Sequence, residues 1–231
     1  MKRIGLVGGI SWSSTIEYYR IINEEINKKL GGLNFGECII YSVNFQDFCS
    51  ANAAYDGDAT FALMLNAVNQ LTKAGAELIL LGANTAHMVA DRIVSETGLP
   101  IIDIRVATAK AIKKKGLNKV GLLGTAYTME LDFYKNKLSE HQVEVLIPTN
   151  PAARRFIEQT LLGELGRGII NPETKQFYIQ VANELIAEGA GGIVLGCTEI
   201  PLLLKQEDLA VPVFNTVQIH VEAAIESALT G

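Results

Sequence analysis

Two similar stretches decide the fold of this sequence: AGAELILLGANTAH at Ala74–His87 and EGAGGIVLGCTEIP at Glu188–Pro201. In each, a short apolar run ends in a loop of glycine and small polar residues. Such a run is typical of a strand that is buried on both faces of a parallel sheet. The two stretches begin at residues 74 and 188, which are 114 apart.

Two further pairs of segments repeat in the same order. IGLVGG at Ile4–Gly9 matches VGLLGT at Val120–Thr125, 116 residues later, and LPIIDI at Leu99–Ile104 matches VPVFNT at Val211–Thr216, 112 residues later. Three matches at nearly one spacing predict two half-domains of one architecture. Helical stretches lie between the apolar runs. One is Thr15–Leu30, which places Ile16, Tyr19, Ile22, Ile26 and Leu30 on roughly one face.

This alternation predicts an α/β fold with two pseudo-symmetric, Rossmann-like half-domains that have parallel-sheet cores. The first domain is expected to be discontinuous, over residues 1–103 plus 212–231, and the second to cover 104–211. Strands are expected at Arg3–Val7, Cys38–Val43, Leu78–Leu81, Ile101–Ile104, Lys119–Leu123, Val143–Ile147, Gly192–Leu195 and Val213–Phe214.

Composition narrows the function classes. The 231 residues carry a formal net charge of −5, which argues against a nucleic-acid-binding surface as the main function. The three widely spaced cysteines do not indicate a disulfide framework, and no His, Cys or carboxylate cluster has the spacing of metal ligands. The apolar run in the first residues, MKRIGLVGG, is too short for the core of a signal peptide and is interrupted by glycines. No apolar run is long enough to indicate a membrane helix. We therefore expect a soluble, cytoplasmic protein.

Ligands of parallel α/β sheets bind beyond the carboxyl ends of the strands. Four loops have that position: Gly8–Ser13, Gly82–His87, Gly124–Thr128 and Gly196–Glu199. Their N–H and hydroxyl groups suit an anion, and two facing half-domains would place them around one cleft. The segment GLVGGISW lacks the G-x-G-x-x-G spacing, so a nucleotide cofactor is not expected. Position alone leaves Cys197 open as a reactive or a structural cysteine, and its counterpart 114 residues earlier is Ala83.

The segments GGISWSSTIEYY, GANTAH, GTAYTME and LGCTEIPLLL resemble the loop motifs of the aspartate/glutamate racemase family, along essentially the whole chain. The similarity is to the branch of broad-specificity amino-acid racemases that act without pyridoxal phosphate. It implies an active site between two α/β domains, an amino acid as substrate, no cofactor and frequent homodimers, with no nucleic-acid or membrane partner.

In most members of this family, two cysteines remove and return the Cα proton on opposite faces of the substrate. The resemblance implies that Cys197 is one acid/base. It also implies two groups of substrate-binding residues. Those that hold the α-carboxylate or amino group are Asn84, Thr85, Thr125 and Thr198. Those that line the pocket are Ile10, Trp12 and Asn52, while Glu164 lies where relatives reach the substrate's side chain or amine.

The departure from the family is Ala83, at a position where most relatives have Cys and some have Thr. Alanine exchanges no proton, so inversion would need a substitute such as water, Thr85 or His87; for His87 a supporting role is favoured over direct proton transfer. Three accounts follow: an introduced substitution, a natural racemase with another donor, or one-base chemistry such as decarboxylation of a malonate-like acid. A competing class is a protein that binds an amino acid without turnover.

Overall fold

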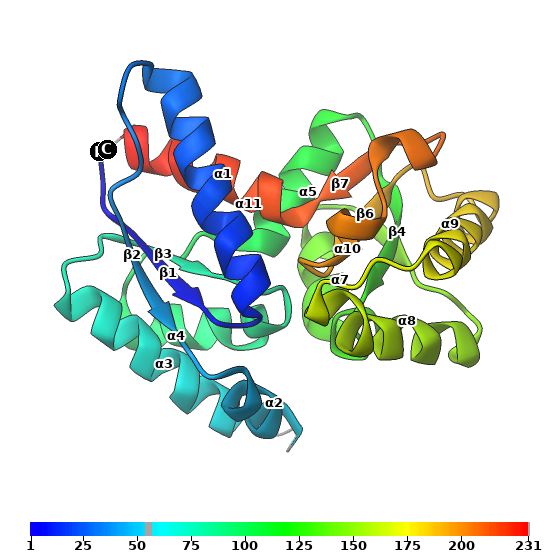
Figure 1. Cartoon of the computed structure of the whole chain (residues 1–231), viewed down its shortest axis with the longest axis horizontal. Helices are drawn as coiled ribbons and strands as arrows, with labels where there is room; N and C mark the ends of the chain where they lie inside the picture. Colours follow the sequence, from blue (N-terminus) through cyan, green and yellow to red (C-terminus); the bar gives the residue numbers. More distant parts are fainter. Residues whose placement is uncertain (54–56, 231) are drawn as a thin grey trace. The chain divides into compact units, whose positions relative to one another are not determined.

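The computed structural model describes residues 1–53 and 57–230 (Figure 1). The chain divides into two compact units. Unit 1 holds Met1–Ile104 and the chain from His220 on, and unit 2 holds Arg105–Ile219. No helix among the described residues is both long and apolar enough to cross a membrane.

Unit 1 contains a parallel sheet in the order β2-β1-β3. Its elements are β1 (Ile4–Gly8), α1 (Trp12–Leu30), β2 (Cys38–Ser42), α2 (Phe45–Ala53), α3 (Asp58–Lys73), β3 (Leu78–Leu81), the 3-10 helix η1 (Thr85–Val89), α4 (Ala90–Thr97) and most of α11 (Thr216–Leu229).

Unit 2 contains a parallel sheet in the order β5-β4-β6-β7. Its elements are α5 (Ile104–Lys114), β4 (Lys119–Gly124), α6 (Ala126–Glu130), α7 (Asp132–Glu140), β5 (Glu144–Leu146), α8 (Pro151–Gly163), η2 (Leu165–Arg167), α9 (Pro172–Ala187), β6 (Ile193–Gly196), α10 (Ile200–Leu203), η3 (Gln206–Asp208) and β7 (Val213–Asn215). The prediction of an α/β fold with parallel sheets in two halves is confirmed.

The strand register reproduces the spacings of the sequence repeat. Leu6 pairs with Leu80 in unit 1, and Leu122 pairs with Val194 in unit 2. Residues 6 and 122 are 116 apart, and residues 80 and 194 are 114 apart. The central strand pair of each unit therefore has the same alignment, and the loops that follow these strands are equivalent.

The third repeated segment forms a paired strand in only one of the two units. In unit 2, Ile193 pairs with Val213 of β7. In unit 1, the equivalent contact is a single bridge between Ile79 and Ile101, so the strand expected at Ile101–Ile104 is wrong. The Ile79 N–H donates to the Pro100 carbonyl, and the Ile102 N–H donates to the Ile79 carbonyl. The pairing goes no further because helix α5 begins at Ile104.

The expected return to the first domain at residue 212 comes later in the structure. β7 (Val213–Asn215) pairs with β6 and thus belongs to the sheet of unit 2. The crossing falls at His220, inside α11. The end of that helix is joined to unit 1 by the bond from the Lys2 N–H to the Ala228 carbonyl.

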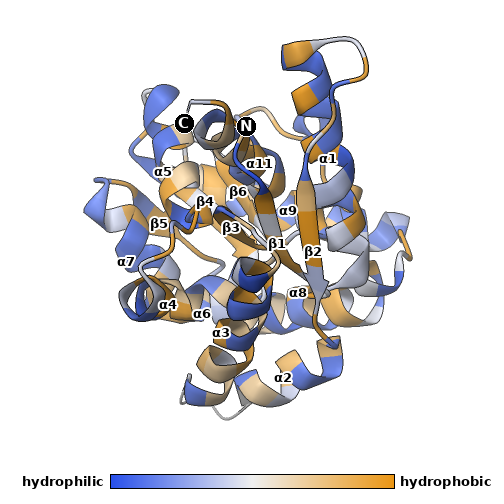
Figure 2. Ribbon diagram, turned by 90° about the vertical axis from the view of Figure 1, so that its left-hand side faces the viewer, coloured by the Kyte–Doolittle hydropathy of each residue, from blue (hydrophilic) through white to orange (hydrophobic). Residues whose placement is uncertain are grey.

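Burial explains most of the pattern. Figure 2 shows the hydrophobic colour concentrated on the strands and the hydrophilic colour on outer helices such as α7. The expected face of α1 needs a correction, because Ile16, Tyr19 and Leu30 are 56%, 51% and 48% exposed. The buried face contains Tyr18, Ile22 and Ile26, which lie four residues apart and form one stripe.

Candidate active site

In unit 1, two adjacent parallel strands place two loops side by side. β1 and β3 are neighbours, and the Gly82 N–H donates to the Val7 carbonyl over 2.8 Å. A Cβ on Gly82 would lie 2.7 Å from that carbonyl oxygen, so this close approach requires glycine. After β1, the Gly9 N–H donates to Thr15 Oγ1 over 2.8 Å. The segments at 8–13 and 82–87 thus form one edge of this unit.

The candidate residues of unit 1 differ in exposure. Ala83, Asn84 and Thr85 are buried at the end of β3. Ile10 is also buried, whereas Trp12 at the start of α1 is 66% exposed.

Asn52 in α2 lies apart in sequence from these loops, and its side-chain oxygen accepts a hydrogen bond from Thr60 Oγ1 over 2.7 Å.

In unit 2, the loops after β4 and β6 have the equivalent positions. Gly124 pairs with Gly196 at the carboxyl ends of these strands. Thr125 caps α6, because its hydroxyl accepts a hydrogen bond from the Thr128 N–H. The hydroxyls of Thr125 and Thr128 also lie 3.1 Å apart. The β4 loop therefore presents ordered hydroxyl groups.

Cys197 lies directly after β6, next to a carboxylate. Its Sγ donates to Glu199 Oε2 over 2.9 Å, and the Thr198 hydroxyl donates to the same oxygen over 2.8 Å. Burial, and then the charge of Glu199, raises the pKa of Cys197 well above its ordinary value. At neutral pH the side chain is a thiol with a proton to donate, and Glu199 is the group within reach to take that proton.

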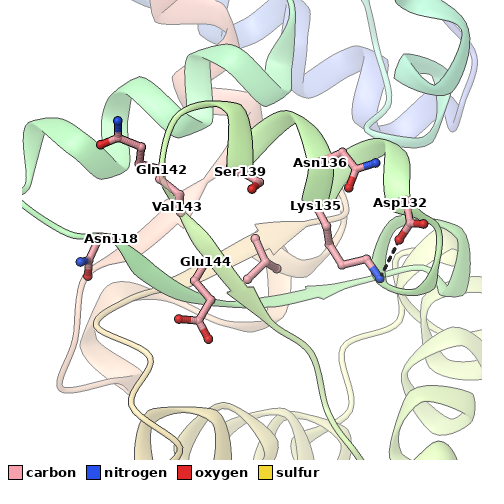
Figure 3. A pocket seen from close by; sticks show the side chains of 9 residues that line it. Asn118, Asp132, Lys135, Asn136, Ser139, Gln142, Val143 and Glu144 are labelled. Carbon is pink, nitrogen blue, oxygen red and sulfur yellow. Dashed lines mark ion pairs between the residues drawn. The ribbon is translucent and has the colours of Figure 1, made fainter.

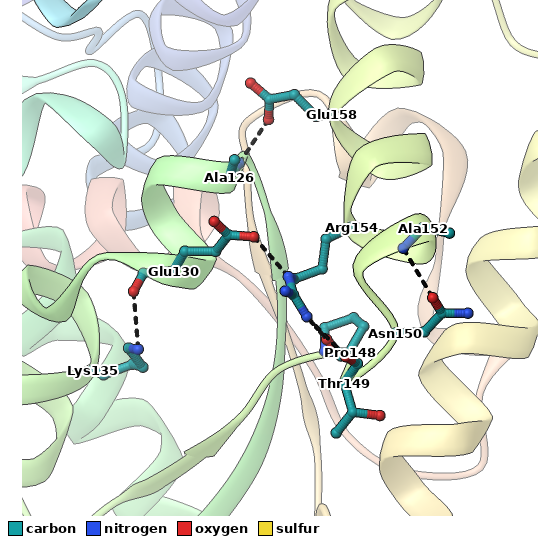
Figure 4. Close-up of polar contacts among 9 residues, drawn as sticks. All are labelled: Ala126, Glu130, Lys135, Pro148, Thr149, Asn150, Ala152, Arg154 and Glu158. Atoms are coloured by element: carbon teal, nitrogen blue, oxygen red, sulfur yellow. Dashed lines mark hydrogen bonds and ion pairs between the residues drawn. The ribbon is translucent and has the colours of Figure 1, made fainter. Parts of the chain in front are cut away.

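Two further titratable side chains lie within electrostatic range of this thiol. Glu158 in α8 accepts a hydrogen bond from the Ala126 N–H over 2.7 Å, as Figure 4 shows. Burial raises the pKa of Glu158, and its charge contributes to the raised pKa of Cys197. Burial also raises the pKa of Tyr178, whose hydroxyl bonds to the Ile157 carbonyl.

Glu164 follows α8, and Thr174 Oγ1 donates to its carboxylate over 2.7 Å. The charge of Glu164 contributes, after burial and other groups, to the raised pKa of Tyr178. The side chain of Glu164 is therefore oriented, and it lies in the same electrostatic environment as Tyr178 and Glu158.

Unit 2 has a hollow beside the β4 loop. It has a volume of about 480 Å³ and is lined by Ala126, Glu130, Pro151, Arg154, Arg155, Glu158 and Gln159. Figure 4 shows Arg154 held by Glu130 and by the carbonyls of Pro148 and Thr149. The hollow thus has fixed charges of both signs at the edge of the sheet where ligands bind.

Another hollow lies at the opposite end of this sheet. It measures about 530 Å³ and is lined by Asn118, Asp132, Lys135, Asn136, Ser139, Gln142, Val143, Glu144 and Val145 (Figure 3). Asn118 and Glu144 stand at the amino ends of β4 and β5, away from Cys197. Its position does not fit the ligand site of a parallel sheet.

The duplicated architecture makes the two units directly comparable. At the spacing of 114, Cys197, Thr198 and Glu199 correspond to Ala83, Asn84 and Thr85. The loop of unit 2 holds a thiol that donates a hydrogen bond to a carboxylate. The loop of unit 1 has a methyl group and a hydroxyl at those positions, so the two units differ in their capacity for proton transfer.

Sequence reasoning did not single out Glu158 or Tyr178. Both lie outside the segment around Cys197, on helices α8 and α9. The tertiary fold brings them near the thiol, and no local motif marks them. For Glu199, the position two residues after Cys197 was an available signal.

Comparison with known proteins identifies the family. The model of the Asp/Glu/Hydantoin racemase family matches residues 7–224, so this chain belongs to that family. A solved structure assigned to the Asp/Glu racemases, from Yersinia pestis, is 44% identical, with a TM-score of 0.92 and coverage of 100% of both chains.

An aspartate racemase homologue from Pyrococcus horikoshii OT3 is 37% identical, with a TM-score of 0.86; the alignment covers 99% of this chain and 100% of that one. The glutamate racemase of Aquifex pyrophilus is 28% identical over 152 residues, which are 64% of this chain and 56% of that protein. The chain thus spans about half the length of the curated relatives it matches.

Proposed function

We propose that this protein is an amino-acid racemase that needs no cofactor, with aspartate, glutamate or a broader set of amino acids as substrates. The observation that carries the proposal is the hydrogen bond from Cys197 Sγ to Glu199 Oε2 at the carboxyl end of β6. It supplies a proton donor and an adjacent acceptor in one loop, which is what chemistry at a weakly acidic Cα–H bond requires.

In the proposed reaction, the proton of Cys197 passes to Glu199, and the thiolate removes the Cα proton on one face. The carbanion that forms is enediolate-like, with its charge on the α-carboxylate. The hydroxyls of Thr125 and Thr198, and the Asn84 and Thr85 segment, are proposed to hold that carboxylate. Ile10, Trp12 and Asn52 are proposed to line the pocket, with Glu164 toward the substrate's side chain or amine. We place this reaction in the cytoplasm.

Inversion also needs a proton on the opposite face. Position 83 is proposed as the site of that second acid/base, and Ala83 does not supply it. A water molecule or Thr85 must therefore deliver the proton, and we expect exchange of the Cα hydrogen to be much faster than inversion.

A second candidate is one-base decarboxylation, which Ala83 and the raised pKa of Cys197 favour together. The bond between Cα and a carboxylate breaks, CO₂ leaves, and the electron pair stays on Cα. The Cys197 thiol then donates its proton to Cα, and solvent restores the thiol. This reaction needs a proton donor on one face and no base on the other.

Isotope exchange tests both candidates. The protein is incubated in D₂O with each enantiomer of aspartate, glutamate and neutral amino acids, and Hα is followed by NMR while chiral chromatography follows inversion. We expect the wild type to incorporate deuterium at Cα. Cys197→Ser should abolish this exchange, and Cys49→Ser, the matched control at an exposed cysteine of α2, should retain it. CO₂ release from a substituted malonate, without exchange, would favour decarboxylation. Binding without any turnover would leave only a binding protein.

A second copy of the chain is the proposed partner. The resemblance to the family supports it, and so do the exposed apolar side chains Ile16 and Tyr19 on α1. Sedimentation should give a dimer that Ile16→Glu weakens.

A further inference from the structure

Unit 1 contains two histidines that the proposed reaction does not use. His87 in η1 and His220 in α11 are both completely buried, with ring centroids 5.3 Å apart. Complete burial of two imidazoles side by side is costly unless their nitrogens are paired. Their partners therefore define what this pair does.

Both nitrogens of His87 are committed to the backbone. Nδ1 lies 2.9 Å from the Ala83 carbonyl oxygen, and the Ile104 N–H points to Nε2 over 3.3 Å. A carbonyl only accepts and an amide N–H only donates, so Nδ1 carries the hydrogen and Nε2 has the lone pair. The ring is neutral and has no nitrogen left to exchange a proton with a substrate.

His220 has the opposite tautomer for the same reason. Its Nε2 lies 2.6 Å from the Ile102 carbonyl, so Nε2 carries the hydrogen, and Nδ1 accepts from the Tyr18 hydroxyl over 2.8 Å. Burial, and then the proximity of His87, lowers the pKa of His220 to about 3. The two rings thus hold the segment at 102–104 through one carbonyl and one amide, and His87 links that segment to Ala83.

The Ala83 carbonyl lies in the same rigid peptide plane as the Asn84 N–H, which points the opposite way. By binding the carbonyl from the buried side, His87 fixes the direction of the Asn84 N–H, away from the imidazole ring. We infer that His87 is a positioning residue: it orients the peptide between Ala83 and Asn84 so that this segment can hold the substrate's α-carboxylate. This inference rests on the proposed function and assigns His87 no proton transfer.

Three substitutions separate the two hydrogen bonds of His87. His87→Asn places an amide N–H near the former Nδ1 and keeps the bond to Ala83. His87→Gln places an amide oxygen near the former Nε2 and keeps the bond to Ile104. His87→Leu keeps neither. His141→Gln in unit 2 is the control for loss of a histidine elsewhere, and thermal unfolding monitors the fold of each variant.

We expect His87→Asn to keep the KM for L-aspartate within about threefold. We expect His87→Gln to raise it about tenfold, the effect of one hydrogen bond, with an unchanged pH profile of kcat. Equal KM values for the two variants would contradict the role assigned to the Ala83 bond. Loss of kcat and of one limb of the pH profile in both variants would make His87 an acid/base and overturn the inference.

Two readouts do not depend on turnover. Nitrogen NMR should find the hydrogen of His87 on Nδ1 and that of His220 on Nε2; the reverse tautomers would overturn the inference. If the wild type binds L-aspartate but exchanges the Cα hydrogen of none of the tested amino acids, the proposed racemase function fails, and the Kd values of the same variants replace KM. If it binds none of the tested amino acids and no malonate, both the proposed function and the inference fail.

Discussion

Acidification is expected to destabilise the protein through His220. Its ring is fully buried against His87 and Tyr18, and burial holds its pKa at about 3, below the ordinary value of 6.5. Below pH 6.5 the imidazole of residue 220 is protonated in the unfolded chain but stays neutral in the folded chain down to about pH 3. The stability contributed by this group is therefore complete above pH 6.5 and is lost as the pH falls toward 3.

The two pKa values give the magnitude. Between pH 8 and pH 6 the loss is about 1 kcal/mol, between pH 8 and pH 5 it is about 2 kcal/mol, and at pH 3 it is about 4 kcal/mol. A loss of 2 kcal/mol is a large share of the stability of an ordinary domain, so the effect is well within the range of a denaturation experiment.

Urea unfolding at pH 8, 6 and 5 measures the effect, followed by the circular dichroism of the wild type and of His220→Gln. Glutamine keeps a donor for the Ile102 carbonyl but does not titrate. The variant starts less stable at pH 8 because the Tyr18 hydroxyl loses its acceptor. Its further loss between pH 8 and pH 5 should be about 2 kcal/mol smaller than that of the wild type. Equal losses in both proteins would refute the reasoning.

Three other substitutions, and one control, test the site and the fold. Glu199→Gln removes the charge and acceptor that raise the pKa of Cys197, so iodoacetamide should modify the thiol faster at pH 8; an unchanged rate would contradict this coupling. Ala83→Cys supplies a thiol at the site proposed for the second acid/base, and polarimetry should show inversion at least about 100-fold faster, the lower range for a positioned acid/base; no increase would place the second acid/base elsewhere. Gly82→Ala places a Cβ 2.7 Å from a backbone oxygen of β1 and should cost about 1–3 kcal/mol in urea unfolding. Gly163→Ala in α8 meets no atom within 4 Å and should not destabilise.

The repeat allowed most of the fold to be predicted, because each repeated segment carries a local signal of its own: an apolar run that ends in a glycine loop. The segments around Leu6, Leu80, Leu122 and Val194 have apolar runs and glycine loops that fix two parallel strand pairs. The strand expected at Ile101 failed for a different reason. Its apolar run matches that of β7, and what separates the two is whether the chain turns into a helix after one bridge, which the pattern does not encode.

The place of the candidate loops in the fold could also be predicted, because Cys197, Thr125 and Asn84 each follow an apolar run that forms a strand. The roles of these residues stay a prediction. Glu158 and Tyr178 reach the vicinity of the thiol only through the packing of α8 and α9 on the sheet. No spacing along the chain predicts a carboxylate 32 residues after the amide that it accepts from.

The difference between the two units bears on the choice among the accounts of Ala83. In unit 2, a carboxylate stands two residues after the acid/base that we propose at Cys197. In unit 1, Thr85 has that position instead, and the Ala83 carbonyl is bound by His87, whose nitrogens are both occupied. The proposed acid/base Cys197 thus has a carboxylate at this position, whereas residue 83 has a hydroxyl. Restoring a thiol at residue 83 provides an acid without a neighbouring carboxylate. The pair Ala83→Cys with Thr85→Glu should therefore invert the substrate faster than Ala83→Cys alone. Equal rates would show that Glu199 does not assist Cys197 and that the asymmetry lies in residue 83 itself.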